Sequence, residues 1–141
     1  MIQAVGKPVA RTSPTREFRS VAWNLTQKDR IGQNAVKEDF EIKVSGYYSL
    51  TATVEMDQTY NAGIRARIIA RVKGNWTNLY GGDAGHYTAD KGMKMTTDRM
   101  TVARTFLNAG DIVAVQTQVN VSAPLKWTGG GDITLKWLGK T

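Results

Sequence analysis

A glycine-rich stretch, residues 81–94, holds the side chains best suited to chemistry, namely Asp83, His86 and Asp90. A histidine between two carboxylates could ligate a metal or act as a base. The chain has one histidine and no cysteine, so zinc would lack the further strong ligands that it needs. The spaced oxygens of a calcium loop, a Gly-x-Ser-x-Gly elbow and a Walker loop are also missing from the sequence. We therefore predict a solvated loop and a protein that is not an enzyme, with no catalytic residue, no metal and no cofactor.

Residues 65–73 offer a different kind of site, a stripe of cations that alternate with small or apolar residues. The cations stand at odd positions together with Ile69, and they are Arg65, Arg67, Arg71 and Lys73. Alternate residues of a strand share a face, so the stripe would extend over roughly 26 Å at about 3.3 Å per residue. It could be solvated, or paired with Glu41 and Glu55 on neighbouring strands. It could instead contact an acidic capsid surface or phosphates, which arginine binds through paired hydrogen bonds.

The 141 residues carry a formal net charge of +7, and the excess lies toward the N-terminus, where residues 1–37 hold seven basic and two acidic side chains. Such a balance favours anionic partners. Residues 1–16 contain no acid and no clear period. We therefore expect residues 1–19 to form an extended basic arm ahead of a single domain at 20–141. The arm supplies four candidates for contact with a partner, Lys7, Arg11, Arg16 and Arg19.

The elements that must carry these side chains have a period of two. It is clearest after Gly46, where Tyr48, Leu50, Ala52, Val54 and Met56 alternate with polar residues, which predicts a half-buried strand. Further strands are expected at 21–25, 40–44, 64–73, 76–80, 95–106, 113–121 and 133–137, with turns at 61–63, 108–111 and 128–132. About eight short strands without a helix predict an all-β antiparallel sandwich or barrel.

Aromatic residues divide into core and surface candidates. Trp23 and Trp137 lie on apolar faces and are expected in the core. Candidates for an oligomer interface are Tyr47, Tyr60 and Trp127. Trp76 and Tyr80 stand near the cationic stripe, and basic residues interleaved with exposed rings are typical of nucleic-acid binding.

Two motifs resemble the jelly rolls of the tumour necrosis factor superfamily and of the globular heads of the first complement component. One is the Gly-x-Tyr strand at Gly46 and Tyr48, where Leu50 replaces the usual aromatic. The other is the Leu-x-x-Gly-Asp-x-Val turn, which begins at Leu107 and contains Gly110, Asp111 and Val113. The resemblance extends over residues 20–138 and implies a jelly roll that trimerises. In the turn we expect a positive φ at Gly110 and a bond from Asp111 to a nearby backbone N–H.

A small jelly roll with a basic arm is also similar to the decoration (cement) proteins of tailed bacteriophages. That analogy implies a virion structural protein that binds the major capsid protein or another virion protein as an oligomer, with a trimer favoured. One alternative is the receptor- or carbohydrate-binding head of a phage fibre, and a second is a capsid subunit whose basic arm contacts nucleic acid. The sequence shows no signal peptide and no membrane-spanning run, so we expect a virion location at the capsid surface and no membrane partner.

Overall fold

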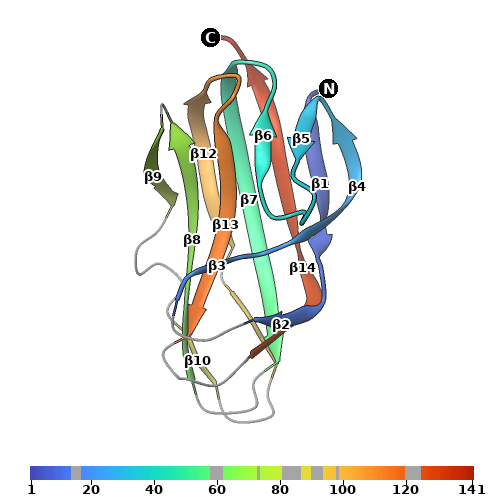
Figure 1. Ribbon diagram of the computed structural model, residues 1–141, viewed down its shortest axis with the longest axis vertical. Coiled ribbons are helices and arrows are strands. Elements are labelled where there is room, and N and C mark those ends of the chain that lie inside the picture. The colour runs from blue at the N-terminus through green and yellow to red at the C-terminus, as the bar shows by residue number, and fades with distance from the viewer. Residues whose placement is uncertain are drawn as a thin grey trace.

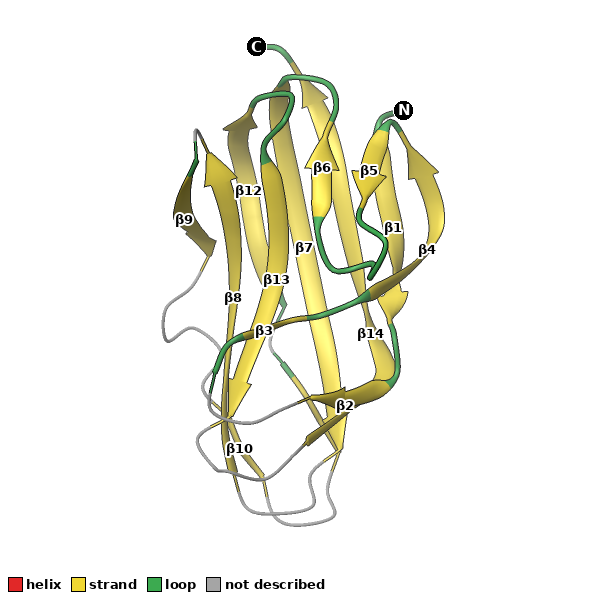
Figure 2. Ribbon diagram, in the orientation of Figure 1, coloured by secondary structure: helices red, strands yellow, loops and turns green. Residues whose placement is uncertain are grey.

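The chain folds into two antiparallel sheets that pack face to face, with no helix in the described residues (Figure 1). The computed structural model describes residues 1–13, 17–57, 62–72, 74–80, 87–89, 94–97, 99–119 and 125–141. Both termini lie at the same end of the sandwich (Figure 2). The fold is an all-β jelly-roll sandwich, as predicted. The described residues contain no helix that could cross a membrane.

The first sheet has β7 and β14 at its centre. Its strands are β1 (Gln3–Pro8), β2 (Arg11–Ser13), β4 (Trp23–Asp29), β7 (Gly46–Asp57), β11 (Lys94–Thr96), β12 (Met100–Leu107) and β14 (Leu125–Gly139). The order is β11-β7-β14-β1-β4, with β12 also paired to β7 and β2 paired to β14.

The second sheet is built around β8 and β13. Its strands are β3 (Arg19–Ser20), β5 (Ile31–Gln33), β6 (Phe40–Ile42), β8 (Ala62–Val72), β9 (Asn75–Tyr80), β10 (Tyr87–Ala89) and β13 (Ile112–Val119). The order is β10-β8-β13-β6-β5, with β9 also paired to β8 and β3 paired to β13. The strand β10 lies inside the stretch 81–94, which was predicted to be a loop.

The core between the sheets follows the predicted alternation. The inward side chains of β7, from Tyr48 to Met56, are 0–2 % exposed. They meet the inward residues of β8 and β13, among them Ile68 and Val115, which are fully buried. Because neighbouring positions face outward, the same alternation fixes which side chains each sheet presents to the exterior.

The prediction of a separate N-terminal arm is wrong for the strand β1. It pairs with β14 on one side and β4 on the other, and Ile2 and Ala4 are 3 % and 0 % exposed. The alternation was concealed because the inward positions after Ile2 hold only small residues, Ala4 and Gly6, and then Pro8. At Gly6 an added Cβ would collide with the Asn24 carbonyl oxygen, so β1 needs a glycine to approach β4 this closely.

The predicted turn at 128–132 is wrong as well. β14 runs through this stretch and pairs with β7 on both sides of it, from Lys126↔Asp57 to Gly139↔Tyr47. The register shifts between Trp127 and Gly131. The three consecutive glycines therefore accommodate an irregularity within one strand, a role in which glycine is common.

The turn before β13 is tied to its surroundings by its backbone. Gly110 has a φ of 96°, and the Asp111 carboxylate accepts the Asn108 N–H at 2.8 Å. The Gly110 N–H donates to the Ile42 carbonyl at 2.8 Å, and the Ile42 N–H donates to the Asp111 carbonyl at 2.9 Å. The turn thus fastens the end of β6 to the start of β13.

Candidate binding surfaces

The Asp83–His86–Asp90 cluster lies outside the described residues. Among the residues that the structure describes, no group of three His, Asp or Glu side chains could hold a metal ion. Polar and aromatic surface residues gather on the outer faces of the two sheets.

The cationic stripe lies on the outer face of β8, where Arg65 and Arg71 are exposed and Arg67 is half-buried. Lys73 is outside the described residues. The expected pairing with Glu55 is wrong, because Glu55 belongs to β7 of the other sheet and its carboxylate accepts the Thr128 hydroxyl at 2.7 Å. The stripe and Glu55 therefore lie on different sheets and not on neighbouring strands.

Two other carboxylates lie on the second sheet or beside it. Glu41 pairs with Lys43 at 3.1 Å rather than with the stripe. Burial is the main cause that raises the pKa of Asp39, with a further rise from neighbouring Glu38, while the positive charge of Arg71 acts in the opposite direction. Arg71 thus interacts electrostatically with the Asp39 carboxyl group.

Arg67 is held in a row of polar groups that crosses three strands. Its Nε donates to the Gln116 side-chain oxygen at 2.8 Å, and the Gln116 amide donates to the Ser20 hydroxyl at 3.2 Å. The guanidinium also lies 3.8 Å from the centroid of the Phe18 ring. The strand register produces this row, because Gln116 of β13 stands opposite Arg67 of β8 on one side and opposite Ser20 of β3 on the other.

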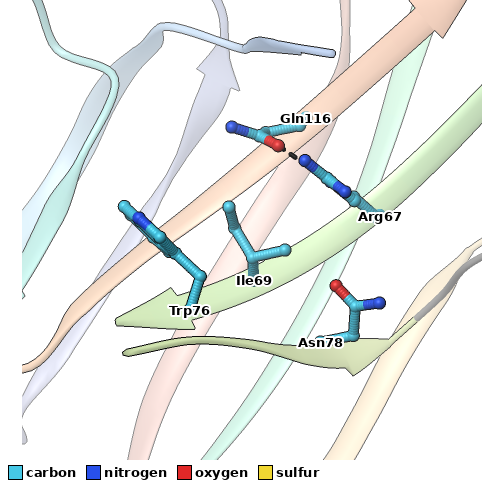
Figure 3. A pocket seen from close by; sticks show the side chains of 5 residues that line it. All are labelled: Arg67, Ile69, Trp76, Asn78 and Gln116. Carbon is cyan, nitrogen blue, oxygen red and sulfur yellow. Dashed lines mark hydrogen bonds between the residues drawn. The ribbon is translucent and has the colours of Figure 1, made fainter. Parts of the chain in front are cut away.

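Beside this row the outer face is hollowed. The hollow has a volume of about 410 Å³ and is lined by Arg67, Ile69, Trp76, Asn78 and Gln116. Figure 3 shows Ile69 between the Trp76 ring and the Arg67–Gln116 pair, with Asn78 on the neighbouring strand. Trp76 is 53 % exposed although its neighbour Ile69 is 4 % exposed.

The outer face of the first sheet carries a different feature, which we call the aromatic patch, formed by Tyr47, Arg104 and Phe106. Tyr47 and Phe106 stand opposite each other on β7 and β12, with ring centroids 5.1 Å apart in an edge-to-face arrangement. The Arg104 guanidinium lies 3.9 Å from the centroid of the Tyr47 ring. Phe106 is 45 % exposed, and Leu138 of β14, the other neighbour of β7, is 43 % exposed.

Of the other predicted contact residues, Trp127 is corrected by the structure. It is 2 % exposed, and its indole N–H donates to the Thr117 hydroxyl at 3.1 Å, so it belongs to the core. Arg11 lies 5.2 Å from the Trp127 ring centroid and pairs with Glu38 at 3.2 Å. It is therefore anchored to the sandwich.

The remaining candidates from the sequence are scattered. Arg19 pairs with Glu17 at 3.4 Å, with both side chains at least half exposed. Lys7 is an exposed residue of β1. Tyr60 and Arg16 are outside the described residues.

Sequence reasoning did not identify the hollow or the partners of Tyr47. Arg67 was a candidate, but Trp76, Asn78 and Gln116 come from β9 and β13 and meet it only through strand register. The pairing of β8 with β13 joins residues far apart in the sequence, and a single sequence does not fix its register. The one available clue was an aromatic residue on the strand that follows the cationic stripe.

The two sheets and their connections define a jelly-roll β-sandwich, and solved structures share this fold. They include the Eiger TNF of S. frugiperda, at a TM-score of 0.71 and 14 % identity over 99 % of this chain and 94 % of that one. Murine APRIL matches at a TM-score of 0.65 and 17 % identity over 96 % of this chain and 99 % of that one.

The globular domain of the zebrafish complement 1qA protein matches over the full length of both chains, at a TM-score of 0.69 and 14 % identity. No protein-family profile and no curated protein sequence matches the chain. At these identities the likeness establishes the fold, and the function has to be argued from the surfaces.

Proposed function

We propose that the chain is a non-enzymatic structural protein that assembles into a homo-oligomer, with a trimer favoured, through the outer face of its first sheet. The observation that carries the proposal is the aromatic patch, where a 45 % exposed Phe106 packs on Tyr47. Aromatic residues and arginine are enriched at protein interfaces. The sequence resemblance to trimer-forming jelly rolls supports the same assembly.

The surroundings of the aromatic patch are suited to a contact between copies. Along β7, the outward residues after Tyr47 are Ser49, Thr51 and Thr53, and Thr134 stands opposite Thr51 on β14. These short uncharged side chains cost little to desolvate compared with ions. The neighbouring positions of β14 also bring charges, because Lys136 stands opposite Ser49 and Asp132 stands opposite Thr53. Exposed rings with short polar neighbours and a charged margin match an interface core with its polar rim.

The assembly that we favour is a phage capsid, on which the oligomer serves as a decoration protein bound to the major capsid protein. The small single-domain jelly roll and the net charge of +7 support it, because a basic surface favours an acidic shell. The exposed cations Arg65 and Arg71 of the second sheet and Lys7 of the first are contact candidates. The strand β1 is not proposed as a free contact arm, because it is paired within the first sheet.

Purified particles of the phage that encodes the chain test this proposal. We expect mass spectrometry to find the chain in a fixed ratio to the major capsid protein. The variant Phe106→Asp should be lost from the particles, whereas Val36→Asp should be retained, because Val36 is an exposed apolar residue in the turn before β6, outside the aromatic patch. Particles that lack the wild-type chain would refute the capsid role.

A receptor- or carbohydrate-binding head is the second candidate function, and the hollow beside Trp76 favours it. Such a head is expected to combine an exposed aromatic ring with polar side chains that can bind a ligand. The hollow provides that combination on the sheet opposite the aromatic patch.

A further inference from the structure

The hollow on the second sheet has an apolar floor and one exposed ring. Ile69 is 4 % exposed at its centre, and Trp76 stands beside it with 53 % of its surface exposed (Figure 3). Trp76 is opposite Arg71 in the pairing of β9 with β8, and Asn78 is opposite Ile69. Both therefore project from the same face as the stripe. The exposed indole ring of Trp76 lies beside this apolar floor and offers a flat surface on which the flat apolar face of a ligand can pack.

The cation in the hollow is fixed but lacks an ionic partner among the described residues. Arg67 has a hydrogen bond to the amide of Gln116 and stacks on Phe18, and neither group is charged. None of the ion pairs formed by the described residues includes it. Burial lowers the pKa of Arg67, yet an arginine stays charged in proteins. A partly desolvated guanidinium with only neutral partners favours an anionic ligand.

Amides make up the remaining polar lining. Asn78 and Gln116 each carry donors and an acceptor, and Gln116 already uses its oxygen for Arg67 and its nitrogen for Ser20. The exposed Asn78 can both donate to and accept from a hydroxyl group. The volume of about 410 Å³ falls within the range of small-molecule sites.

We propose that this hollow binds an acidic saccharide. The apolar face of a pyranose ring lies on Trp76, its carboxylate pairs with Arg67, and a hydroxyl group bonds to Asn78. A nucleic acid is less well matched, because binding a single strand requires successive rings. Among the described residues of β9, Tyr80 packs against the core, which leaves Trp76 as the exposed ring of this strand.

The site is independent of the proposed oligomer contact, because the hollow and the aromatic patch lie on opposite sheets. An oligomer formed through the first sheet would keep every copy of the hollow open. This separation also supplies matched controls. Arg104 stacks on Tyr47 at 3.9 Å much as Arg67 stacks on Phe18 at 3.8 Å, and Phe106 is exposed to a similar degree as Trp76.

The test is an NMR titration that follows the indole N–H of Trp76 at physiological ionic strength. The probes are oligogalacturonate and N-acetylneuraminate, the methyl esters of both, which remove the negative charge, and oligothymidylate. We expect the acids to move the Trp76 signal and to bind at least about tenfold more tightly than the esters. In Trp76→Ala, which lacks this signal, the Asn78 side-chain amide is followed instead, and binding should be abolished. Arg67→Gln should make acid and ester equal, whereas Phe106→Ala and Arg104→Gln should bind like wild type.

Thermal melts and light scattering of the same variants separate loss of binding from loss of fold or assembly. If Arg67→Gln lowers the melting temperature, Arg67→Lys keeps the charge and should still prefer the acids. The proposal is overturned if neither acid moves the Trp76 signal, or if acids and esters bind equally. It is also overturned if oligothymidylate binds more tightly than the saccharides, or if Arg104→Gln weakens binding as much as Arg67→Gln does.

Discussion

Replacing Gly110 by valine isolates backbone strain from packing. Gly110 has a φ of 96°, and a Cβ added there would meet no heavy atom within 4 Å. The substitution therefore costs the strain of a β-branched residue at positive φ, about 1–3 kcal/mol. For a chain of this length, 1 kcal/mol lowers the melting temperature by about 3–4 °C.

Circular dichroism melts at one fixed protein concentration measure this effect, because the melting temperature of an oligomer depends on concentration. Gly110→Asn is the matched control, since asparagine tolerates positive φ better than other residues with a side chain. It should fall between the wild type and Gly110→Val. A valine variant that melts within about 2 °C of wild type would show that the turn does not require this conformation.

The remaining predictions concern the core, the titration of one carboxyl group and the first strand. In urea melts, Trp127→Phe should lower the free energy of unfolding by about 1 kcal/mol more than Trp23→Phe does. The reason is that the Trp127 indole N–H donates a hydrogen bond to Thr117, whereas the buried Trp23 indole nitrogen has no partner among the described residues. Equal losses would contradict this reasoning. Burial raises the pKa of the Asp39 carboxyl group above its ordinary 3.8. The folded state therefore keeps the carboxyl proton to a higher pH than the unfolded chain does. Stability should fall as the pH rises from 3.8 through the raised pKa. Asp39→Asn should remove that fall in melts recorded across this pH range, and an unchanged pH profile would refute the assignment. Deletion of residues 1–8 should abolish the cooperative transition in a thermal melt, because β1 lies between two strands, and a truncated chain that melts like wild type would restore the arm.

Much of the fold could be predicted from alternation where the inward residues are large. In β7 the apolar side chains from Tyr48 to Met56 identify both the strand and its buried face. In β1 the buried positions of the same alternation hold alanine, glycine and proline. These residues are small or common in loops, so the alternation is not recognised as a strand pattern. The three glycines of β14 predicted a turn, but the structure has an irregularity within one continuous strand there. Local composition could not distinguish a bulge from a turn, because both favour glycine.

The candidate site was predicted only in part, for a related reason. Alternation placed Arg65, Arg67 and Arg71 on one face of a strand. The polar row through Gln116 and the position of Trp76 depend on which strands pair with β8 and in which register. The pairing with β13 joins residues far apart in the sequence, so Gln116 could not be associated with the stripe beforehand. Trp76 follows the stripe closely in the sequence and was expected near it.

The proposed homo-oligomer is tested most directly by the mass of the purified protein in solution. Light scattering at micromolar concentration should give three times the 15.5 kDa of one chain. Phe106→Asp, which places a charge in the aromatic patch, should reduce the mass to that of one chain, while Val36→Asp should leave it unchanged. A wild-type protein that scatters as a single chain would contradict the account.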